Sequence, residues 1–324
     1  MYKVKELQEI TNNYIAENKI GREPFSLYDP INYTLLSGGK RIRPVLVLMS
    51  CNLFSEDINQ TIDAAVGLET FHNFTLLHDD IMDKADVRRG NPTVHKKWNE
   101  NTAILSGDAM FIKAYDFFLK CKSPNLHEIL TVFNNTALEV CEGQQYDMEF
   151  ENRDQVSETE YIRMIELKTS VLLAAALKIG AIIGGANNSD AELLYEFGRN
   201  IGLAFQLQDD LLDVYGNTEV FGKIIGGDIV ANKKTFLLIK AKELAKSKER
   251  EILEKYLNDK SCLREEKVKA ITSIYDNINI KNITQNKIQE YHNKALEFLN
   301  KVSVSDERKI ELKKLTEKLI QREK

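Results

Sequence analysis

The chain has 324 residues, of which 43% are hydrophobic, so it can bury a large core as one large domain or two small ones. Its formal charge of −5 is small for this length and no polybasic tract is present, so composition gives no reason to expect a nucleic-acid partner. The last of only five prolines is Pro124. Because a stack of helices needs fewer Pro-bearing turns than an α/β or all-β chain, we predict an all-α protein with a single domain, residues 1–324.

Cysteine spacing and the apolar segments favour a soluble protein of the cytoplasm. The four cysteines lie far apart without metal-ligand spacing, which indicates buried thiols in a reducing compartment. The charged N-terminus, MYKVKELQEI, lacks the apolar core of a signal peptide. The most apolar segment, 171–186, is interrupted by Lys178, and its uncharged run falls short of the roughly 18 residues of a membrane span. We therefore expect a buried central helix there and no membrane span.

In chain order, the first predicted elements are two helices separated by loops. Apolar residues recur at helical spacing over 4–20, and a Pro-bearing loop is expected to follow as far as Pro30. The apolar stretch 45–54 predicts the second helix. Before it stands GGKRIRP, in which Lys40 and Arg43 could bind one diphosphate while the glycines let the backbone approach an anion closely. Solvated loop charges are the alternative interpretation of this motif alone.

A cluster of carboxylates follows the next predicted helix, 62–78. Positions i and i+4 of a helix lie about 40° apart in azimuth and about 6 Å apart along the axis, so Asp79 and Asp83 point the same way, with Asp80 beside them. Carboxylates this close repel one another unless a cation joins them, and Mg²⁺ binds carboxylate and phosphate oxygens. His72 falls nearly in line with Asp79, about two turns earlier, and is either a core histidine or part of an anion site.

The same spacing recurs at Asp209, Asp210 and Asp213, again at the end of an apolar helical stretch. A single DDxxD motif is better explained as a solvated acidic helix end. The second copy instead favours two metal clamps on facing helices that hold one diphosphate between them.

The segments between the two acidic motifs supply further cations. Residues 86–92 are predicted to form a loop that carries Arg88 and Arg89 over the first motif, since Gly90 to Pro92 would stop a helix. Three more helices are expected, at 103–120, 126–150 and 161–186.

The last of these three helices contains LKTS, with Lys168 and Thr169. Ser189 followed by Glu192 has the spacing of a capping box, which predicts the start of the helix that ends in the second acidic motif.

A glycine-rich loop, VFGKIIGGDIVANKKTF, follows the second acidic motif and would present Lys223 and Lys233 to the carboxylates before it. Glycine plus lysine alone is a weak motif, because the spacing and the preceding strand of a P-loop are both missing. The remaining chain from Lys234 onward has the pattern of four or five amphipathic helices.

Together, GGKRIRP, HDDIMD with DVRRG, LKTS, FQLQDDLLD and the GK to NKKT stretch resemble trans-isoprenyl diphosphate synthases of the polyprenyl synthetase family in order and approximate spacing. The resemblance covers nearly the whole chain. It implies an isoprenoid synthase fold, which is an all-α helical bundle around a central cavity and is usually a homodimer. In that fold the two Asp-rich motifs face each other across the cavity.

The resemblance also implies roles for individual residues. The ligands of two to three Mg²⁺ ions per active site would be Asp79, Asp80, Asp83, Asp209, Asp210 and Asp213. The allylic diphosphate would be held by Arg88, Lys168, Thr169, Gln206, Lys223 and Lys233, with Lys234 as an alternative to the last. Isopentenyl diphosphate would be held by Lys40, Arg43, His72 and Arg89. The residues expected to be catalytic are Asp79, Asp80, Asp83, Lys168, Asp209, Asp210 and Lys223.

The predicted activity is that of a trans-prenyltransferase, which condenses isopentenyl diphosphate head to tail with an allylic diphosphate. Breaking the allylic C–O bond puts negative charge on the departing diphosphate, and metals with fixed cations stabilise that charge. The carbocation left behind needs a dry apolar pocket. Attack by the double bond of isopentenyl diphosphate and loss of a proton then add one isoprene unit.

Two other functions are compatible with parts of this pattern. A class I terpene cyclase shares one DDxxD motif, but the second intact motif and GGKRIRP argue against it. A non-catalytic subunit of a heteromeric synthase would be expected to have lost acidic residues, and this chain retains all six.

Product length should depend on what fills the cavity below the first acidic motif. Phe74 and Phe71 lie about 7.5 and 12 Å down the helix from Asp79, and Thr75 between them and the motif is small. An aromatic residue five positions before the first aspartate resembles short-chain synthases, so we expect a C20 product over C15. On a straight helix Phe71 is closer in azimuth to Asp79 than Phe74 is, so either ring could be the floor, and both could be ordinary core residues.

Overall fold

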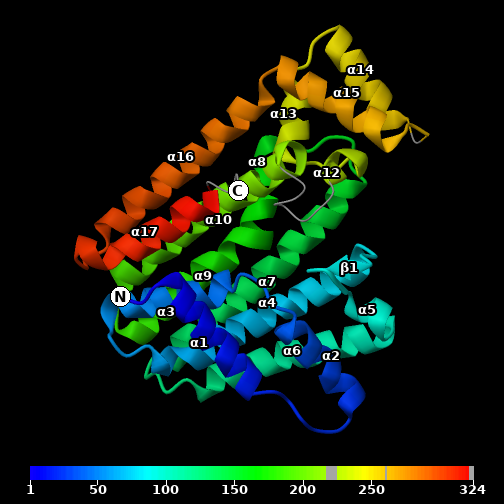
Figure 1. The fold of residues 1–324 in the computed structure, drawn as a ribbon. Helices are drawn as coiled ribbons and strands as arrows, with labels where there is room; N and C mark the ends of the chain where they lie inside the picture. The colour runs from blue at the N-terminus through cyan, green and yellow to red at the C-terminus, as the bar shows by residue number, and fades with distance from the viewer. Residues whose placement is uncertain (217–224, 260, 321–324) are drawn as a thin grey trace. The chain divides into compact units, whose positions relative to one another are not determined.

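The computed structural model describes residues 1–216, 225–259 and 261–320 (Figure 1). Within these ranges the only strands are β1 (Val87–Arg88) and β2 (Asn91–Pro92), which pair antiparallel as one small hairpin. All other regular elements there are helical, so the all-α prediction is confirmed.

The described helices follow one another with short connections. They are α1 (Val4–Glu17), α2 (Phe25–Leu36), α3 (Ile42–Phe54), η1 (Asn59–Thr61), α4 (Ile62–Met82), α5 (Val94–Lys97), α6 (Glu100–Lys120), α7 (Leu126–Glu151), α8 (Glu158–Ile165), η2 (Glu166–Ser170), α9 (Val171–Gly184), α10 (Asn188–Tyr215), α12 (Gly227–Val230), α13 (Phe236–Leu244), α14 (Lys248–Asn258), α15 (Arg264–Asn277), α16 (Ile280–Lys301) and α17 (Asp306–Ile320). Most predicted helices are found within a few residues of their expected bounds, and five described helices fill the region after Lys234.

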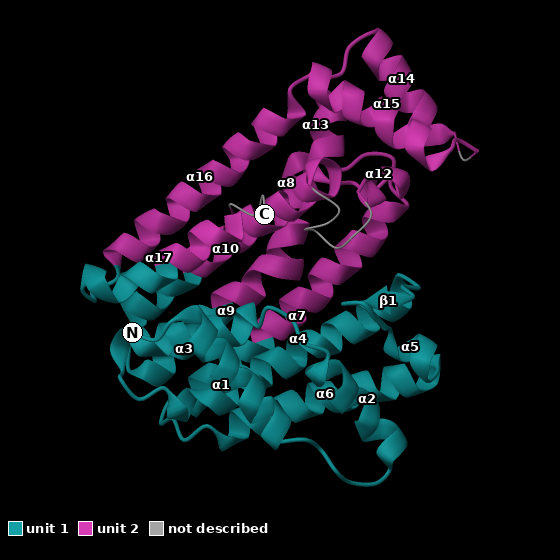
Figure 2. Cartoon of the chain, in the orientation of Figure 1, with its two compact units in different colours: residues 1–134, 175–195, 302–312 teal, residues 135–174, 196–301, 313–324 magenta. Residues whose placement is uncertain are grey.

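The chain forms two compact units, coloured separately in Figure 2. Unit 1 comprises residues 1–134, 175–195 and 302–312, and unit 2 comprises residues 135–174, 196–301 and 313–324. The expectation of a single domain stays a prediction. Each unit contains one of the two acidic motifs.

The core of unit 1 forms around α3, which is buried from Pro44 to Leu53. Helix α9 approaches α3 at two glycines: a Cβ on Gly180 would lie 2.1 Å from the Val47 carbonyl oxygen, and one on Gly184 would lie 2.7 Å from that of Cys51. Contacts this short leave room for hydrogen only, so the two helix backbones lie nearly in contact.

Unit 2 has a second core, to which α8, α10, α13, α15 and α16 contribute buried side chains. In Figure 1, α14 and α15 form a helical hairpin whose two arms run side by side. Leu253 of α14 and Ile271 of α15 are almost fully buried and belong to the same core. This packing attaches the helical hairpin to the rest of the unit.

The helical run Glu158–Gly184 is long and apolar enough to cross a membrane by length and composition. The uncharged run within 171–186 is short, as expected, but α8, η2 and α9 continue one another along the chain, so the whole helical run reaches the length of a span. Its most apolar window is nevertheless 78% buried inside the protein, as a core helix would be.

Proline misled the prediction near the N-terminus. Residues up to Pro30 were expected to form a loop, but α2 begins at Phe25 and contains Pro30. A proline inside a helix costs about 3 kcal/mol, whereas burying one large apolar side chain yields about 1.5–3 kcal/mol. Helix α2 buries Tyr28, Ile31 and Leu35, so burial outweighs the lost hydrogen bond.

The predicted capping box at Ser189 was also wrong. Helix α10 begins at Asn188, and the backbone N–H of Asp190 donates to Oδ1 of Asn187 at 2.9 Å. The Asn187 amide in turn donates to the Asp190 carboxylate at 2.9 Å. Asparagine is as good an N-cap as serine, so the cap lies two residues earlier than expected.

Burial of the thiols is less complete than predicted. Cys51 and Cys121 are buried, but Cys141 is exposed and Cys262 is partly exposed. Both of the latter lie on or beside helical segments with charged outer positions, where a small apolar side chain is tolerated.

Replacement of Gly180 by alanine tests the close packing of α9 on α3. Gly180→Ala should lower the free energy of unfolding by about 1–3 kcal/mol, because the cost of the new clash exceeds the helix propensity gained. Thermal unfolding followed by circular dichroism measures the change. Gly21→Ala is the control, since a Cβ there meets no atom within 4 Å. Equal melting temperatures for the two variants would contradict the packing described.

Candidate functional site

The first acidic motif lies at the C-terminal end of α4. Asp79 and Asp80 belong to the last turn, and Asp83 is the C-cap, whose backbone N–H donates to the Asp79 carbonyl at 2.8 Å. Asp80 is only 5% exposed, and burial raises the pKa of its carboxyl, an effect partly offset by Arg88.

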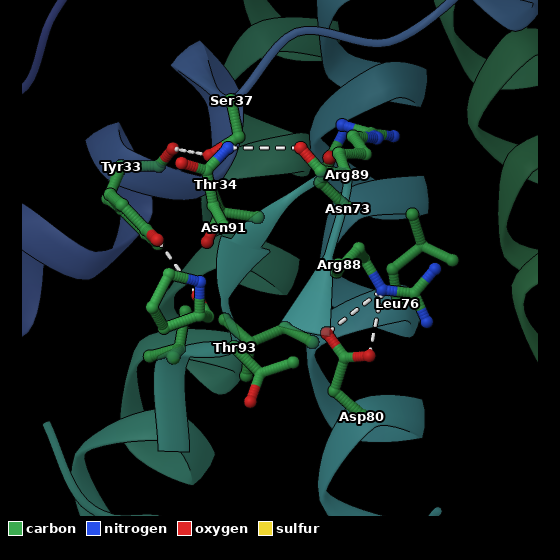
Figure 3. Close-up of a pocket in the computed structure, with 13 residues that line it drawn as sticks. Tyr33, Thr34, Ser37, Asn73, Leu76, Asp80, Arg88, Arg89, Asn91 and Thr93 are labelled. Atoms are coloured by element: carbon green, nitrogen blue, oxygen red, sulfur yellow. Dashed lines mark hydrogen bonds and ion pairs between the residues drawn. The ribbon is translucent and has the colours of Figure 1, made fainter. Parts of the chain in front are cut away.

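Arg88 holds this motif from the β hairpin. Its Nε donates to both carboxylate oxygens of Asp80, at 2.8 and 2.9 Å, and its Nη2 lies 3.5 Å from Oδ2 of Asp79. Figure 3 shows Arg88 and Asp80 pointing toward each other at the edge of a pocket. The position predicted for Arg88, over the acidic motif, is the one observed.

Arg89 does not lie over the acidic motif, contrary to the prediction. Arg89 and Gly90 have φ angles of 54° and 75°, the left-handed values of a type I′ turn, so residues 86–92 form a tight hairpin rather than an open loop. In Figure 3, Arg89 extends away from Asp80. Its Nη1 donates to the Gly38 carbonyl at 2.5 Å, and a Cβ on Gly39 would lie 2.9 Å from its Cζ. Two adjacent arginines therefore reach two different places.

Arg89 joins Arg43 and His72 in what we call the basic cluster. Nη1 of Arg43 lies 2.9 Å from Nε2 of His72. Burial, and then repulsion from Arg43 and Arg89, hold the pKa of His72 well below its ordinary value, so the imidazole is neutral at pH 7. Burial lowers the pKa of Arg43 to about 10, with a smaller contribution from Arg89. The arginines remain charged at neutral pH.

The positive charge of the basic cluster is not balanced by described acids. Glu69 is nearby, but it pairs with Arg41 at 2.9 Å, and both side chains are almost fully buried. Within the described ranges no carboxylate forms an ion pair with Arg43 or Arg89, and Nε of Arg43 is buried without a hydrogen-bond partner. Lys40 is exposed on the loop before α3. A region with excess positive charge and unused N–H donors is suited to an anion.

The pocket in Figure 3 lies beside these groups in unit 1. Its polar lining includes Asp80, Arg88 and Arg89, and its apolar lining includes Leu76 and Leu77 of α4. It therefore adjoins both the acidic motif and one arginine of the basic cluster.

In unit 2, LKTS does not continue the helix regularly. Residues 166–170 form η2, a π-helical turn, where a single α-helix was predicted. Two glycines allow this wider turn to pack: a Cβ on Gly143 would lie 2.3 Å from the backbone nitrogen of Lys168, and one on Gly202 would lie 2.4 Å from Cα of Ser170. Single π turns are frequent at functional sites, and this one orients Lys168 and Thr169.

Lys168 and Lys233 share one carboxylate, that of Asp147 on α7. Nζ of Lys168 lies 2.6 Å and Nζ of Lys233 lies 3.8 Å from Oδ2 of Asp147. Burial alone would raise the pKa of Asp147, but attraction to Lys233 and Lys168 outweighs it, so the pKa is lowered. Two cations therefore share this carboxylate, and Lys233 also attracts the carboxylate of Asp210.

The second acidic motif is held by hydrogen bonds within unit 2. Tyr161 donates its hydroxyl to Asp210, and Nε2 of Gln206 donates to Oδ1 of Asp210 at 3.2 Å. Oε1 of Gln206 accepts from the Thr169 hydroxyl at 3.0 Å. Burial, and then repulsion from Asp228, raise the pKa of Asp210 to about 7, an effect that the two hydrogen bonds partly oppose. The carboxyl therefore lies near its titration point at neutral pH.

Asp209 is half-buried, while Asp213 is buried and has a structural contact. Its Oδ2 accepts the backbone N–H of Asp228 at 2.9 Å, and its backbone carbonyl accepts that of Gly226. The third aspartate thus holds the start of α12. Lys223 lies outside the described residues.

Within each unit, then, the predicted residues come together in groups. Unit 1 combines the acidic motif with Arg88, and Arg43 with His72 and Arg89. Unit 2 combines Lys168 with Lys233, and Thr169 with Gln206 and Asp210. Among the described residues, no three acidic, histidine or cysteine side chains converge closely enough to bind a metal by themselves.

The donor set nevertheless fits Mg²⁺ chemically. Mg²⁺ is commonly held by one or two carboxylates, with substrate phosphates and water completing its coordination, so a closed cluster of protein ligands is not required. Asp79, Asp80 and Asp209 supply oxygen donors of that kind.

Sequence reasoning missed Asp147, Tyr161 and Asp228. Asp147 is 21 residues from Lys168, and Tyr161 is 49 residues from Asp210. No local spacing connects such pairs. Only the helix packing reveals that these residues belong to the site.

The profile of the family described as polyprenyl synthetase matches residues 25–275. The chain belongs to the polyprenyl synthetase family. It is 46% identical over 222 residues, 68% of each chain, to geranylgeranyl diphosphate synthase of Methanosarcina mazei.

Solved structures agree with this membership. One described as geranylgeranyl pyrophosphate synthase matches with a TM-score of 0.94 at 43% identity and covers 100% of both chains. Another is geranylgeranyl pyrophosphate synthase from Corynebacterium glutamicum, complexed with isoprenyl diphosphate and magnesium. It matches with a TM-score of 0.88 at 25% identity and covers 99% of this chain and 100% of that one. The predictions of a trans-isoprenyl diphosphate synthase, its isoprenoid synthase fold and its prenyltransferase activity are confirmed.

The charge of Asp147 in this polyprenyl synthetase can be tested through pH. Because its folded pKa is lowered, the carboxylate stabilises the fold above its unfolded pKa of about 3.9, and that stability is lost as pH falls through the folded pKa. Asp147→Asn should therefore lower the free energy of unfolding by about 1 kcal/mol at pH 7. The effect is modest because Lys233 is partly screened by solvent. Near pH 3 the variant and wild type should differ by less.

Urea titrations at the two pH values measure this difference. Glu297→Gln, at an exposed position on α16 of the same unit, is the control and should match wild type at both. If the difference in free energy of unfolding between Asp147→Asn and wild type does not change with pH, the variant has lost packing and not a charge interaction.

Proposed function

We propose that this enzyme condenses isopentenyl diphosphate with an allylic diphosphate, in the presence of Mg²⁺, to give a C20 prenyl diphosphate. The observation that carries the proposal is the coexistence of two cationic groups, Arg43 with Arg89 and Lys168 with Lys233, with two acidic motifs. Two diphosphates need two sets of cations, whereas a cyclase with one diphosphate substrate needs only one. The names of the relatives agree with the C20 product.

The basic cluster, together with Lys40, is proposed to bind isopentenyl diphosphate. Its two arginines can each donate two parallel hydrogen bonds to phosphate oxygens, and the neutral His72 can donate one more. Gly39 keeps the space that the Arg89 guanidinium occupies, so the shape of this site depends on the glycines of GGKRIRP.

The second set of cations is proposed to bind the allylic diphosphate. It comprises Lys168 and Lys233 with their shared Asp147, together with Arg88, Thr169 and Gln206. Lys223 completes the set as a prediction. Lys233 is preferred to Lys234 here, because Lys233 lies near Asp147. Lys234 instead lies near Lys242, where burial and then repulsion from Lys234 lower the pKa of Lys242.

Asp79, Asp80, Asp83, Asp209, Asp210 and Asp213 are proposed as Mg²⁺ ligands, directly or through water. When bound, the metal neutralises charge on the departing diphosphate. Asp213 is the least suited to direct ligation, since its carboxylate already accepts from the α12 backbone. The lysines and arginines hold the leaving group and stabilise the charge that develops on it. No nucleophilic side chain is needed.

A homodimer is proposed from one face of α6. Leu105, Ile112 and Leu119 are 59%, 63% and 60% exposed and recur every seven residues, so they form one apolar stripe along the helix. A second copy of the same stripe is its natural cover. The cytoplasmic location stays a prediction.

The metal-dependent reaction is tested with purified enzyme, radiolabelled isopentenyl diphosphate, and dimethylallyl, geranyl or farnesyl diphosphate as primer. Turnover should require Mg²⁺ and stop with EDTA. Asp79→Ala and Asp209→Ala should each reduce it by at least about a hundredfold while leaving the helical circular dichroism spectrum unchanged, because a ligand and no core contact is lost.

Lys269→Met, at an exposed position on α15, is the matched control and should keep wild-type turnover. Near wild-type rates in either aspartate variant would disprove the role given to that motif. Release of inorganic diphosphate without isopentenyl incorporation would indicate a cyclase.

Product length is proposed to depend on the aromatic layer below Asp79. The ring of Phe74 lies 5.4 Å from Phe111 of α6, 5.6 Å from Phe71 and 4.8 Å from His78. Phe71 is fully buried under this layer, whereas Phe74 is partly exposed, so a growing chain along α4 would meet Phe74 first. Thr75 donates its hydroxyl to the His72 carbonyl at 2.8 Å, and its side chain, one turn before Asp79, is small.

Phe74→Ala should therefore give products longer than C20, because it opens the layer that stops the chain. Phe71→Ala should mainly lower stability, by about 3–5 kcal/mol, with little change in product length. Reversed-phase chromatography of the dephosphorylated products measures the distribution. If Phe71→Ala alone lengthens the product, Phe71 is the floor, and if neither variant changes it, α4 does not determine length.

A further inference from the structure

The turn that carries Lys233 is held by contacts that the reaction itself does not use. This turn, residues 231–235, follows α12, and the Lys233 backbone N–H donates to the Asp228 carbonyl at 2.9 Å. Asn232 has a φ of 53°, a left-handed conformation that asparagine tolerates better than most residues. We call 231–235 the lysine turn.

The side chain of Asn232 connects the lysine turn to two other helices. Its Nδ2 donates to the Leu257 carbonyl of α14 at 2.9 Å, and its Oδ1 accepts from Nζ of Lys267 on α15 at 2.7 Å. Both ends of the amide are occupied, and the two partners require opposite ends, so its orientation is fixed.

Lys267 is unusual for a lysine because only 7% of it is exposed. Its ammonium also donates to the carbonyl of Val230, the last residue of α12, at 3.2 Å. In the described part of the chain no carboxylate forms an ion pair with it, and its ammonium donates to two neutral oxygens, those of Val230 and Asn232. Burying a cation against neutral oxygens is costly, and a methionine of similar length would fill the space without that cost. A lysine at this position is therefore explained by the hydrogen bonds that its ammonium donates, and not by packing.

We propose that Lys267, acting through Asn232, is a positioning residue that holds Lys233 in place for the allylic diphosphate. In this proposal Lys267 and Asn232 do not bind the diphosphate themselves. We call the hydrogen bonds of Asn232 with Lys267 and Leu257 the clamp. The role of Lys233 rests on the proposed function, but the clamp rests on these contacts alone.

The position of Lys233 needs such support. Its Nζ lies 3.8 Å from Oδ2 of Asp147, a longer and weaker contact than the 2.6 Å contact of Lys168, and its side chain is 46% exposed. The reach of the ammonium therefore depends on the backbone of the lysine turn as well as on the contact with Asp147. A misplacement of about 1 Å in a substrate-positioning group can cost up to about a hundredfold in rate.

The test compares Lys267→Met with Lys269→Met, an exposed lysine two residues later on α15. Lys267→Met should raise the KM for the allylic primer that wild type uses best by about tenfold, while the KM for isopentenyl diphosphate changes by less than about twofold. Lys269→Met should match wild type in both. An equal rise in both KM values, or no rise in the first, would overturn the proposal, because a general loss of structure affects both substrates alike.

Asn232→Gly separates the clamp from the backbone conformation. Glycine keeps the left-handed φ without strain but removes both hydrogen bonds. If Lys267 acts through Asn232, this variant should show the same selective change, and the double variant should be no worse than either single one. Effects that multiply in the double variant would show that the two residues act independently.

Titration calorimetry with inorganic diphosphate and Mg²⁺ provides a readout that needs no turnover. Binding to Lys267→Met should be about tenfold weaker than to wild type or Lys269→Met. Inactive wild-type enzyme with every primer would reject the proposed function alone, whereas equal diphosphate affinities in the three proteins would reject the clamp.

Discussion

Like charges held close together are the constraint on which this structure depends. Arg43 and Arg89 lie around a neutral histidine in unit 1, and Lys168 and Lys233 share a single carboxylate in unit 2. The two arginines repel each other, so the surrounding packing must hold them, whereas the two lysines are attracted to the carboxylate that they share. The helical cores supply that support, and a diphosphate can supply the missing negative charge.

Close contacts between backbones position the charged residues within each unit. Gly143 and Gly202 let their helices approach η2 so closely that the turn carrying Lys168 has little room to shift. Gly39 serves the Arg89 guanidinium in the same way. In each case the absence of a side chain on glycine leaves the space that the charged segment or group occupies.

Sequence reasoning predicted the helices, the two acidic motifs and the family, because these depend on periodicity and local spacing. It placed Arg88 correctly, since a turn after a helix end returns toward it. It misplaced Arg89, because the difference between an open loop and a type I′ hairpin depends on two φ angles that composition does not reveal. It missed Asp147 and the π turn for a related reason, since both arise from packing between distant helices.

The errors at Pro30 and Ser189 have a common origin. In both places one sequence signal was opposed by a stronger effect. At Pro30, burial of apolar side chains outweighed the cost of proline in a helix. At Ser189, Asn187 was an equally good N-cap two residues earlier. Residues such as Lys267 are beyond any such rule. Nothing in the sequence distinguishes this lysine from Lys269, and only burial separates them.

The hairpin at β1 and β2 sets how far apart two chemical environments are. Arg88 reaches a carboxylate and Arg89 reaches the glycines before α3 from consecutive positions, so the separation is fixed by one peptide unit. An insertion of a single residue between Asp86 and Arg88 would turn the Arg88 side chain to the opposite face of the strand, away from Asp80. Over evolutionary time this turn should therefore accept substitutions at its exposed positions but hardly any change of length, unlike the longer connection between α1 and α2.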